Sequence, residues 1–127
     1  MLAIVGLGVD LVRIARFDAF VTRGKMAVIQ RIFSDKEQSY CLTQAQPGQH
    51  FAVRFAAKEA FLKALGTGLR DGISWQEMVV ERDELGCPSL QVTGHAARVL
   101  AKKGGRSIYL SYSHDGDYGV ATVVLEV

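Results

Sequence analysis

Apolar and polar residues alternate at both ends of the chain, which is the pattern of half-buried β-strands. Over residues 2–12 the alternation separates apolar side chains from small or acidic ones, with Leu7, Val9 and Leu11 on one face and Gly6, Gly8 and Asp10 on the other. Residues 107–113 and 118–126 have the pattern of two further strands, joined by a short turn at residues 114–117. We therefore expect one strand at the N-terminus and a hairpin at the C-terminus.

Helical patterns occupy the middle of the chain. A helical stretch is expected over residues 14–33, with an interruption near Gly24. Ser34 and Glu37 have the spacing of a capping box, so another helix should begin there and be broken at residues 47–48, a Pro-Gly pair. These signals predict separate helices in the first half of the chain.

The longest helix is expected over residues 49–65, because Gly66 stands where a glycine commonly ends a helix. After it we expect a glycine-rich loop, two strands and a short helix, over residues 66–72, 73–82, 89–92 and 93–103. Because strands lie at both ends and helices lie between them, the sequence predicts an α+β fold with helices packed on an antiparallel sheet.

Composition and charge narrow the class of protein. With 127 residues, of which 49% are hydrophobic and 22% charged, residues 1–127 are expected to form one small domain with its own core. The net charge of +2 argues against non-specific nucleic-acid binding. Residues 11–33 nevertheless contain one acid and five basic residues, Arg13, Arg16, Arg23, Lys25 and Arg31. A basic stretch of this kind suits an acidic partner.

The cysteines and the N-terminus indicate a cytoplasmic protein. Cys41 and Cys87 form no disulfide framework, so we expect free thiols in a reducing compartment. The chain begins without the pattern of a signal peptide, and no apolar run approaches the length that crosses a membrane. Histidines and cysteines are not spaced as in a zinc site, and His50 and His95 carry no motif.

The long central helix carries charges among apolar residues. With about 100° of rotation per residue, Glu59 and Lys63 fall between a phenylalanine stripe and an alanine stripe, so they should lie in or beside the core. Arg54 and Lys58 lie on another side of this helix. Glu59 and Lys63 could form an ordinary ion pair one helical turn apart. Alternatively, the glutamate could bind a cation or act as a base while the lysine holds a phosphate.

Asp10 is the second carboxylate of interest. Gly6 and Gly8 leave its strand face bare, so a ligand or another backbone can approach closely. The alternatives are a bulge or a helix contact, with Asp10 capping the helix that follows. His114 ends a strand before a turn, where a polar residue needs no functional reason.

Three segments together resemble a known family. They are residues 6–12, in which Gly8-Val9-Asp10 is followed by Arg16; residues 54–68, which read RFAAKEAFLKALGTG; and residues 110–114 with the strand after them. In this order they are similar, over essentially the whole chain, to the bacterial holo-acyl-carrier-protein synthases, which are small 4′-phosphopantetheinyl transferases. The resemblance implies the fold of that family.

The resemblance also implies a reaction. Enzymes of this family move phosphopantetheine from coenzyme A to a serine of apo-acyl carrier protein in fatty acid biosynthesis, and release adenosine 3′,5′-bisphosphate. By position, Asp10 and Glu59 would hold Mg²⁺, although oxygen ligands suit Mn²⁺ as well. Glu59 would also activate the serine, and Lys63 would hold the phosphate as the bond breaks.

Further positions carry over by the same match. Arg54 and His114 would contact the 3′-phosphate end of coenzyme A, and Gly66 and Gly68 would let the backbone approach the nucleotide. Residues on the basic stretch would bind the acidic carrier protein, namely Arg16, Phe20, Arg23 and Arg31. Because family members are trimers with active sites between subunits, a homotrimer is implied.

The sequence departs from the family pattern at two places, and two other functions are alternatives. Cys87 stands where a basic residue is common, and an insertion near residues 26–30 blurs the alignment of Arg31.

A non-catalytic module that binds coenzyme A or the carrier protein would have no need of both carboxylates, Asp10 and Glu59. A basic helical module that binds nucleic acid is disfavoured by the low net charge.

Overall fold

The computed structural model describes residues 3–127, apart from the side chains of residues 70 and 71. Leu2, the expected first residue of the N-terminal strand, lies outside the described residues. The elements follow one another as β1 (Ile4–Arg13), α1 (Ile14–Thr22), α2 (Met26–Ile32), α3 (Asp35–Leu42), α4 (Pro47–Leu65), η1 (Gly68–Asp71), η2 (Trp75–Glu77), β2 (Met78–Arg82), β3 (Pro88–Val92), α5 (Gly94–Lys102), β4 (Ser107–Asp115) and β5 (Tyr118–Glu126).

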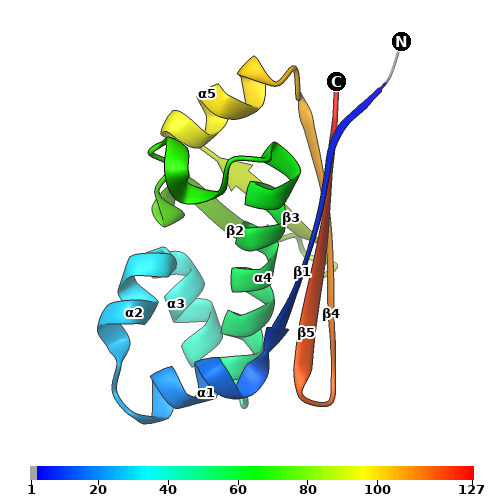
Figure 1. Ribbon diagram of the computed structural model, residues 1–127. Coiled ribbons are helices and arrows are strands. Elements are labelled where there is room, and N and C mark those ends of the chain that lie inside the picture. Colours follow the sequence, from blue (N-terminus) through cyan, green and yellow to red (C-terminus); the bar gives the residue numbers. More distant parts are fainter. Residues whose placement is uncertain (1–2) are drawn as a thin grey trace.

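The first and last strands form one antiparallel sheet in the order β1-β5-β4, and β2 and β3 form a separate antiparallel pair. Helix α4 runs along one face of the three-stranded sheet, and α1, α2 and α3 lie on the far side of α4 (Figure 1). A cluster of phenylalanines fills the space between α4 and these helices: Phe17, Phe33, Phe51 and Phe55. The predicted α+β fold is confirmed.

Two glycines decide how closely α4 approaches β1. A Cβ on Gly8 would lie 1.9 Å from the carbonyl oxygen of Ala60, and one on Gly6 would lie 2.3 Å from that of Ala64. Only a strand without side chains at these positions can lie against a helix that presents alanines. The bare face of β1 therefore receives another backbone, which was one of the expected alternatives. Asp10 does not cap α1, whose N-cap residue is Arg13.

The predicted alternation in β1 is confirmed, but its apolar face is the solvent-facing one. Because the glycine face packs on α4, Leu7 and Leu11 point outward and keep 66% and 64% of their surface exposed. Ile4 and Val9 on the same strand and Tyr109 on β4 are also exposed. This outer sheet face, defined by Ile4, Leu7, Val9, Leu11 and Tyr109, is an apolar surface of the kind that commonly marks an interaction site.

Several predicted boundaries change. The chain turns near Gly24, whose φ is +69°, and Ser34 and Glu37 form the predicted capping box. Pro47 does not keep the long helix from starting, because it occupies the first turn, where its missing N–H costs nothing. The strand expected over residues 73–82 was wrong in its first half, since Ser74 caps a short 3₁₀ helix before β2 begins.

No helix within residues 3–127 is both long enough and apolar enough to cross a lipid bilayer. Cys41 and Cys87 are free thiols, as predicted. Cys41 is buried, and burial raises the pKa of its thiol to about 12, whereas Cys87 is exposed in the turn between β2 and β3.

Candidate active site

Helix α4 carries charged residues on two opposite flanks. With about 100° per residue, His50, Arg54 and Lys58 follow one another along one flank, and Glu59 lies about 140° around the helix from Arg54. Lys63 continues on the flank of Glu59. Helix α4 packs mainly on β1 and β5, so one of its flanks lies beside the edge strand β1 and the other faces toward β4. We call these the β1 flank, with Glu59 and Lys63, and the β4 flank, with Arg54.

On the β1 flank, Lys63 reaches across to Asp10. Its Nζ lies 3.0 Å from Asp10 Oδ1 and 3.1 Å from the carbonyl oxygen of Val9. The Lys63 side chain is 53% exposed and that of Asp10 is 15% exposed. The structure therefore brings together two of the three residues expected to carry catalysis, from segments 53 residues apart.

Glu59 completes this group. It is partly buried, and burial raises the pKa of its carboxyl above the usual value. The negative charge of Asp10 raises that pKa further, and the positive charges of Lys63 and Arg16 oppose the shift. Within residues 3–127 no ion pair joins Glu59 to Lys63, so the ordinary pairing one turn apart is not what these residues form.

The two neighbouring carboxylates suit a hard divalent cation. Asp10 and Glu59 offer oxygen ligands, and a cation would relieve the repulsion that raises the pKa of Glu59. In the described part of the chain no group of three or more His, Cys, Asp or Glu residues could hold a metal by itself. The donor set thus fits Mg²⁺, which commonly takes one or two carboxylates and completes its shell with water and substrate phosphates.

On the β4 flank, Arg54 is buried without a carboxylate. It is 2% exposed, and its Nη1 donates to the carbonyl oxygen of His50 at 3.1 Å. Its Cζ lies 4.7 Å from the ring centroid of Tyr40 and 5.9 Å from that of Tyr112. Among the described residues, no carboxylate comes within 4 Å of the guanidinium. A buried cation with only carbonyl and aromatic partners is suited to bind an anion.

His114 lies beside the start of α4. Its Nε2 is 3.0 Å from Nε2 of Gln49, and it lines a small cavity with His50, Arg82 and Tyr112. Burial lowers the pKa of His50, and the positive charge of Arg54 and the nearby His114 lower it further. Tyr112 lines this cavity and also packs against Arg54, so His114 and Arg54 lie on the same flank of α4.

The remaining predicted residues lie at the end of α4 and on or beside α1 and α2. Gly66 ends α4 with φ +83°, and Gly68 has φ +61°, so both hold backbone conformations that side chains disfavour. Arg16 packs its guanidinium 5.1 Å from the ring of Phe55, close enough to act on Glu59. Phe20 meets Phe17 edge-on, and Arg23 and Arg31 are exposed. Of the four residues expected to bind a carrier, Arg16 lies close enough to Glu59 for its positive charge to lower the pKa of the Glu59 carboxyl.

Comparison with known proteins decides the family. Residues 6–123 match the model of the 4′-phosphopantetheinyl transferase superfamily. The chain belongs to that superfamily. It is 58% identical, over 95% of its length and 94% of the relative's, to a holo-[acyl-carrier-protein] synthase of Syntrophotalea carbinolica. It is 52% identical to the synthase of Geotalea daltonii, covering 97% of this chain and 98% of that one. The chain is accordingly a transferase of the holo-[acyl-carrier-protein] synthase type.

Solved structures of the family share the fold. The synthase of Neisseria meningitidis superposes with a TM-score of 0.86 at 32% identity, covering 97% of this chain and 98% of that one. A Helicobacter pylori synthase, solved in complex with coenzyme A, superposes with a TM-score of 0.81 at 28% identity over 94% and 98%. The arrangement of α4 on the sheet is therefore common to the transferase family.

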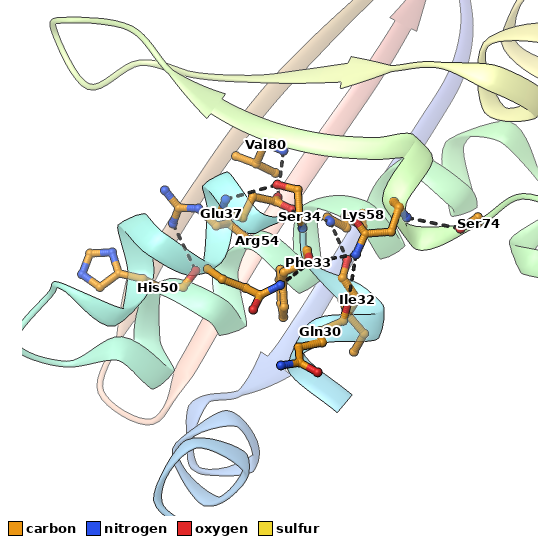
Figure 2. A network of polar contacts seen from close by, with 12 residues as sticks. Gln30, Ile32, Phe33, Ser34, Glu37, His50, Arg54, Lys58, Ser74 and Val80 are labelled. Carbon is orange, nitrogen blue, oxygen red and sulfur yellow. Dashed lines mark hydrogen bonds and ion pairs between the residues drawn. The ribbon is translucent and has the colours of Figure 1, made fainter. Parts of the chain in front are cut away.

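The expectation that Glu59 and Lys63 are the charges in or beside the core was wrong for Lys63. The transferase buries Lys58 instead, with 0% exposure, and its Nζ donates to the carbonyl oxygen of Ile32 at 2.7 Å and to Glu37 Oε1 at 2.8 Å (Figure 2). Glu37 Oε2 accepts from the backbone N–H of Val80 at 2.9 Å. Burial lowers the pKa of Lys58, and Glu37 opposes that shift.

Sequence reasoning missed Glu37 as a partner of Lys58, although it identified Glu37 as a capping residue. One Glu37 oxygen accepts from the Ser34 N–H at 2.9 Å and also from Lys58. A capping box predicts only the local contact, and no sequence signal linked it to α4. Tyr40 and Arg82, which lie near Arg54, were also missed, because nothing in the local pattern indicates that α3 and β2 meet there.

Proposed function

We propose that residues 1–127 form one transferase domain that moves the 4′-phosphopantetheine group from coenzyme A to a serine of apo-acyl carrier protein, in fatty acid biosynthesis. The serine Oγ forms a bond to the phosphorus next to the pantetheine, and the pyrophosphate P–O bond breaks to release adenosine 3′,5′-bisphosphate. The observation that carries the proposal is the cluster of Asp10, Glu59 and Lys63 in a chain of this superfamily.

Glu59 is proposed as the general base. Its carboxylate takes the proton of the serine hydroxyl as the new P–O bond forms, and such help typically contributes about 10²–10⁴ in rate. Partial burial and the nearby Asp10 both raise its pKa, so it is a better base than an exposed glutamate. Its place on α4 fixes its position against β1.

Asp10 and Glu59 would hold Mg²⁺ between them. When bound, this ion neutralises charge on the pyrophosphate and on the leaving phosphate. The two carboxylates supply fewer ligands than the ion needs, which leaves room for substrate oxygens. Mn²⁺ prefers the same oxygen ligands, so we expect it to replace Mg²⁺ in part.

Lys63 is proposed to bind the phosphate that bears the breaking bond. Its ammonium is half exposed and bonded to Asp10 and a backbone carbonyl. An exposed pair is worth only about 0–1 kcal/mol, so Lys63 can turn from Asp10 to a phosphate at little cost. There it stabilises the negative charge that builds up as the donor cleaves.

The β4 flank is proposed to bind the nucleotide end of the donor. Arg54 is a buried cation with no carboxylate within 4 Å among the described residues, and His114 lies on the same flank, which suits the 3′-phosphate of coenzyme A. Gly66 and Gly68 would let the loop after α4 lie close to the nucleotide. A relative from Helicobacter pylori binds coenzyme A, which supports this donor.

We propose a homotrimer whose active sites each combine two copies. Within one chain, α4 separates the Asp10–Glu59 group from Arg54 and His114, so one extended donor cannot easily touch both. If the β1 flank of one copy meets the β4 flank of the next, both groups face one donor. The outer sheet face, with Leu7 and Leu11 about two-thirds exposed, is the apolar surface for such an association.

The carrier protein is proposed to dock on the basic stretch. Arg16 and Phe20 lie on α1, Arg23 caps its C-terminal end and Arg31 lies on α2. These two helices follow β1 and its Asp10 in the chain. Basic side chains on this surface would steer an acidic carrier so that its serine arrives near Glu59. We place this activity in the cytoplasm, where the free thiols Cys41 and Cys87 stay reduced.

Mass spectrometry of apo-acyl carrier protein tests the reaction. With this protein, coenzyme A and Mg²⁺, the carrier should gain the mass of one phosphopantetheine group, and EDTA should prevent the gain. Glu59→Gln should abolish it, whereas Lys102→Gln on α5 should not. If the carrier binds but gains no mass, the chain is a binding module and the proposed transfer is wrong. Salt-sensitive binding to DNA, rather than to carrier, would favour the nucleic-acid alternative.

Complementation tests the shared site. Asp10→Asn and Arg54→Gln should each be inactive alone, but co-expressed chains should regain part of the activity, since a mixed oligomer holds some intact sites. Recovery would fail if each chain used its own Asp10 and Arg54. Light scattering should give three copies for the wild type, and Leu7→Glu should lower that number while circular dichroism stays unchanged.

A further inference from the structure

Two cavities meet at the turn between β2 and β3. The larger, of about 390 Å³, is lined by Arg54, Tyr40 and Arg82, and the smaller, of about 130 Å³, by His50, Arg82 and His114. Arg82 is thus common to both. The first volume is within the range of small-molecule sites, whereas the second is below it and suits a single small group such as a phosphate.

The charges of the two cavities differ. Four carboxylates line the larger one, and three of them have partners: Glu37 bonds Lys58, Glu81 lies 3.9 Å from Lys36, and Asp83 accepts from two backbone N–H groups. The fourth is Glu84. Among the described side chains no carboxylate lines the smaller cavity, whose polar groups include two imidazoles and one guanidinium. An anion therefore finds its complement in the smaller cavity.

Arg82 is held so that its charge stays available. Its Nε donates to the Gly86 carbonyl oxygen at 3.4 Å, its Cζ lies 5.2 Å from the Tyr40 ring centroid, and Nη1 contacts the Tyr40 hydroxyl. Among the described residues no carboxylate lies within 4 Å of it. Arg54 packs on the same Tyr40 ring. It also donates to the carbonyl oxygen of His50, a contact that Figure 2 shows. Both guanidinium groups therefore pack on one tyrosine ring, and neither has a carboxylate within 4 Å among the described residues.

We infer that Arg82 is a specificity residue of the donor site: it binds the 3′-phosphate of the donor and makes the enzyme select coenzyme A over 3′-dephospho-coenzyme A. This inference rests on the proposed function. Neither the family motifs nor the resemblance assigned a role to Arg82, which lies at the end of β2. A planar guanidinium donates to two phosphate oxygens at once, a geometry that lysine and histidine lack.

The test compares two pairs of ligands in the wild type and in Arg82→Gln. Calorimetry measures the binding of adenosine 3′,5′-bisphosphate and of adenosine 5′-monophosphate, and steady-state kinetics measures KM for coenzyme A and for its 3′-dephospho form. We expect Arg82→Gln to weaken bisphosphate binding, and to raise KM for coenzyme A, by about 10- to 100-fold, as for a lost charged hydrogen bond. The 3′-dephospho ligands should change by less than about threefold.

Control variants separate a specific effect from a structural one. Arg82→Lys should restore part of the preference for the 3′-phosphate, and Arg98→Gln, an exposed arginine on α5, should change neither ligand. An equal loss for both ligands of a pair, or no loss at all, would overturn the inference. If the wild type binds the bisphosphate through Arg82 but never modifies the carrier, the proposed transfer fails and the specificity of the site still stands.

Discussion

Helix α4 carries two lysine–carboxylate pairs of nearly equal length that serve different purposes. Lys58 lies 2.8 Å from Glu37 with both side chains fully buried, and Lys63 lies 3.0 Å from Asp10 with the lysine half exposed. In the first pair every polar atom has a fixed partner, because Lys58 also binds the Ile32 carbonyl. In the second pair water competes for the lysine, whose side chain is 53% exposed, whereas that of Asp10 is 15% exposed.

Burial, rather than distance, decides what such a pair can do. Separating Lys58 from Glu37 would leave a bare charge in the core, so this pair holds α3, α4 and β2 in one arrangement. Separating Lys63 from Asp10 costs little, since solvent replaces the partner. The exposed pair is therefore the one that can exchange partners during a reaction, and the buried pair keeps the helix that carries it in place.

Removing the buried lysine should have the largest effect on stability. Lys58→Met leaves the Glu37 carboxylate buried without its cation, which should lower the free energy of unfolding by about 3–5 kcal/mol. Lys63→Met should lower it by less than about 1 kcal/mol. Urea unfolding of both variants measures this contrast. Equal losses in the two variants would show that burial does not distinguish the pairs.

Removing the exposed lysine should lower catalysis much more than stability. Lys63→Met takes away a donor to the phosphate, so kcat should fall by about 10²–10³-fold while the unfolding midpoint is nearly unchanged. Single-turnover transfer to the carrier protein measures it, with Lys102→Met as the matched control. A normal kcat in Lys63→Met would remove Lys63 from the proposed chemistry.

Neutralising both members of the buried pair should be milder than removing the lysine alone. In the double variant Glu37→Gln with Lys58→Met, no net charge is left in the core, and the glutamine oxygen still accepts from a backbone N–H. We expect the double variant to be more stable than Lys58→Met by about 1–2 kcal/mol. A double variant no more stable than the single one would mean that the hydrogen bonds of Glu37, rather than its charge, dominate.

The smallest effect concerns Glu59 and pH. Because its pKa in the folded chain is raised, the native state favours the protonated form, and this contribution to stability is lost as pH rises through the folded pKa. Glu59→Gln, which stays neutral, should therefore be more stable than the wild type at neutral pH without divalent ions, and equal to it at pH well below the usual glutamate range. Thermal unfolding against pH tests this. A gain that persists at low pH would contradict it.

Much of the site could be read from local sequence. The bare face of β1, the capping box at Ser34 and the end of α4 at Gly66 each depend on a few neighbouring residues, and each is found as predicted. The position of Asp10 beside Glu59 followed only from family resemblance, since strand and helix lie far apart in the chain.

The sequence alone determined the strands, most of the helices, the family and the residues on each flank of α4, because periodicity and local caps are properties of neighbouring residues. The packing of distant segments settled which lysine is buried, that the apolar face of β1 faces solvent, and that Arg82 and Arg54 pack on the same Tyr40 ring. The reason is physical. Whether a charge lies in water or in the core depends on which distant segment covers it: α3 and β2 cover Lys58, whereas Lys63 contacts the edge strand β1 and stays half exposed.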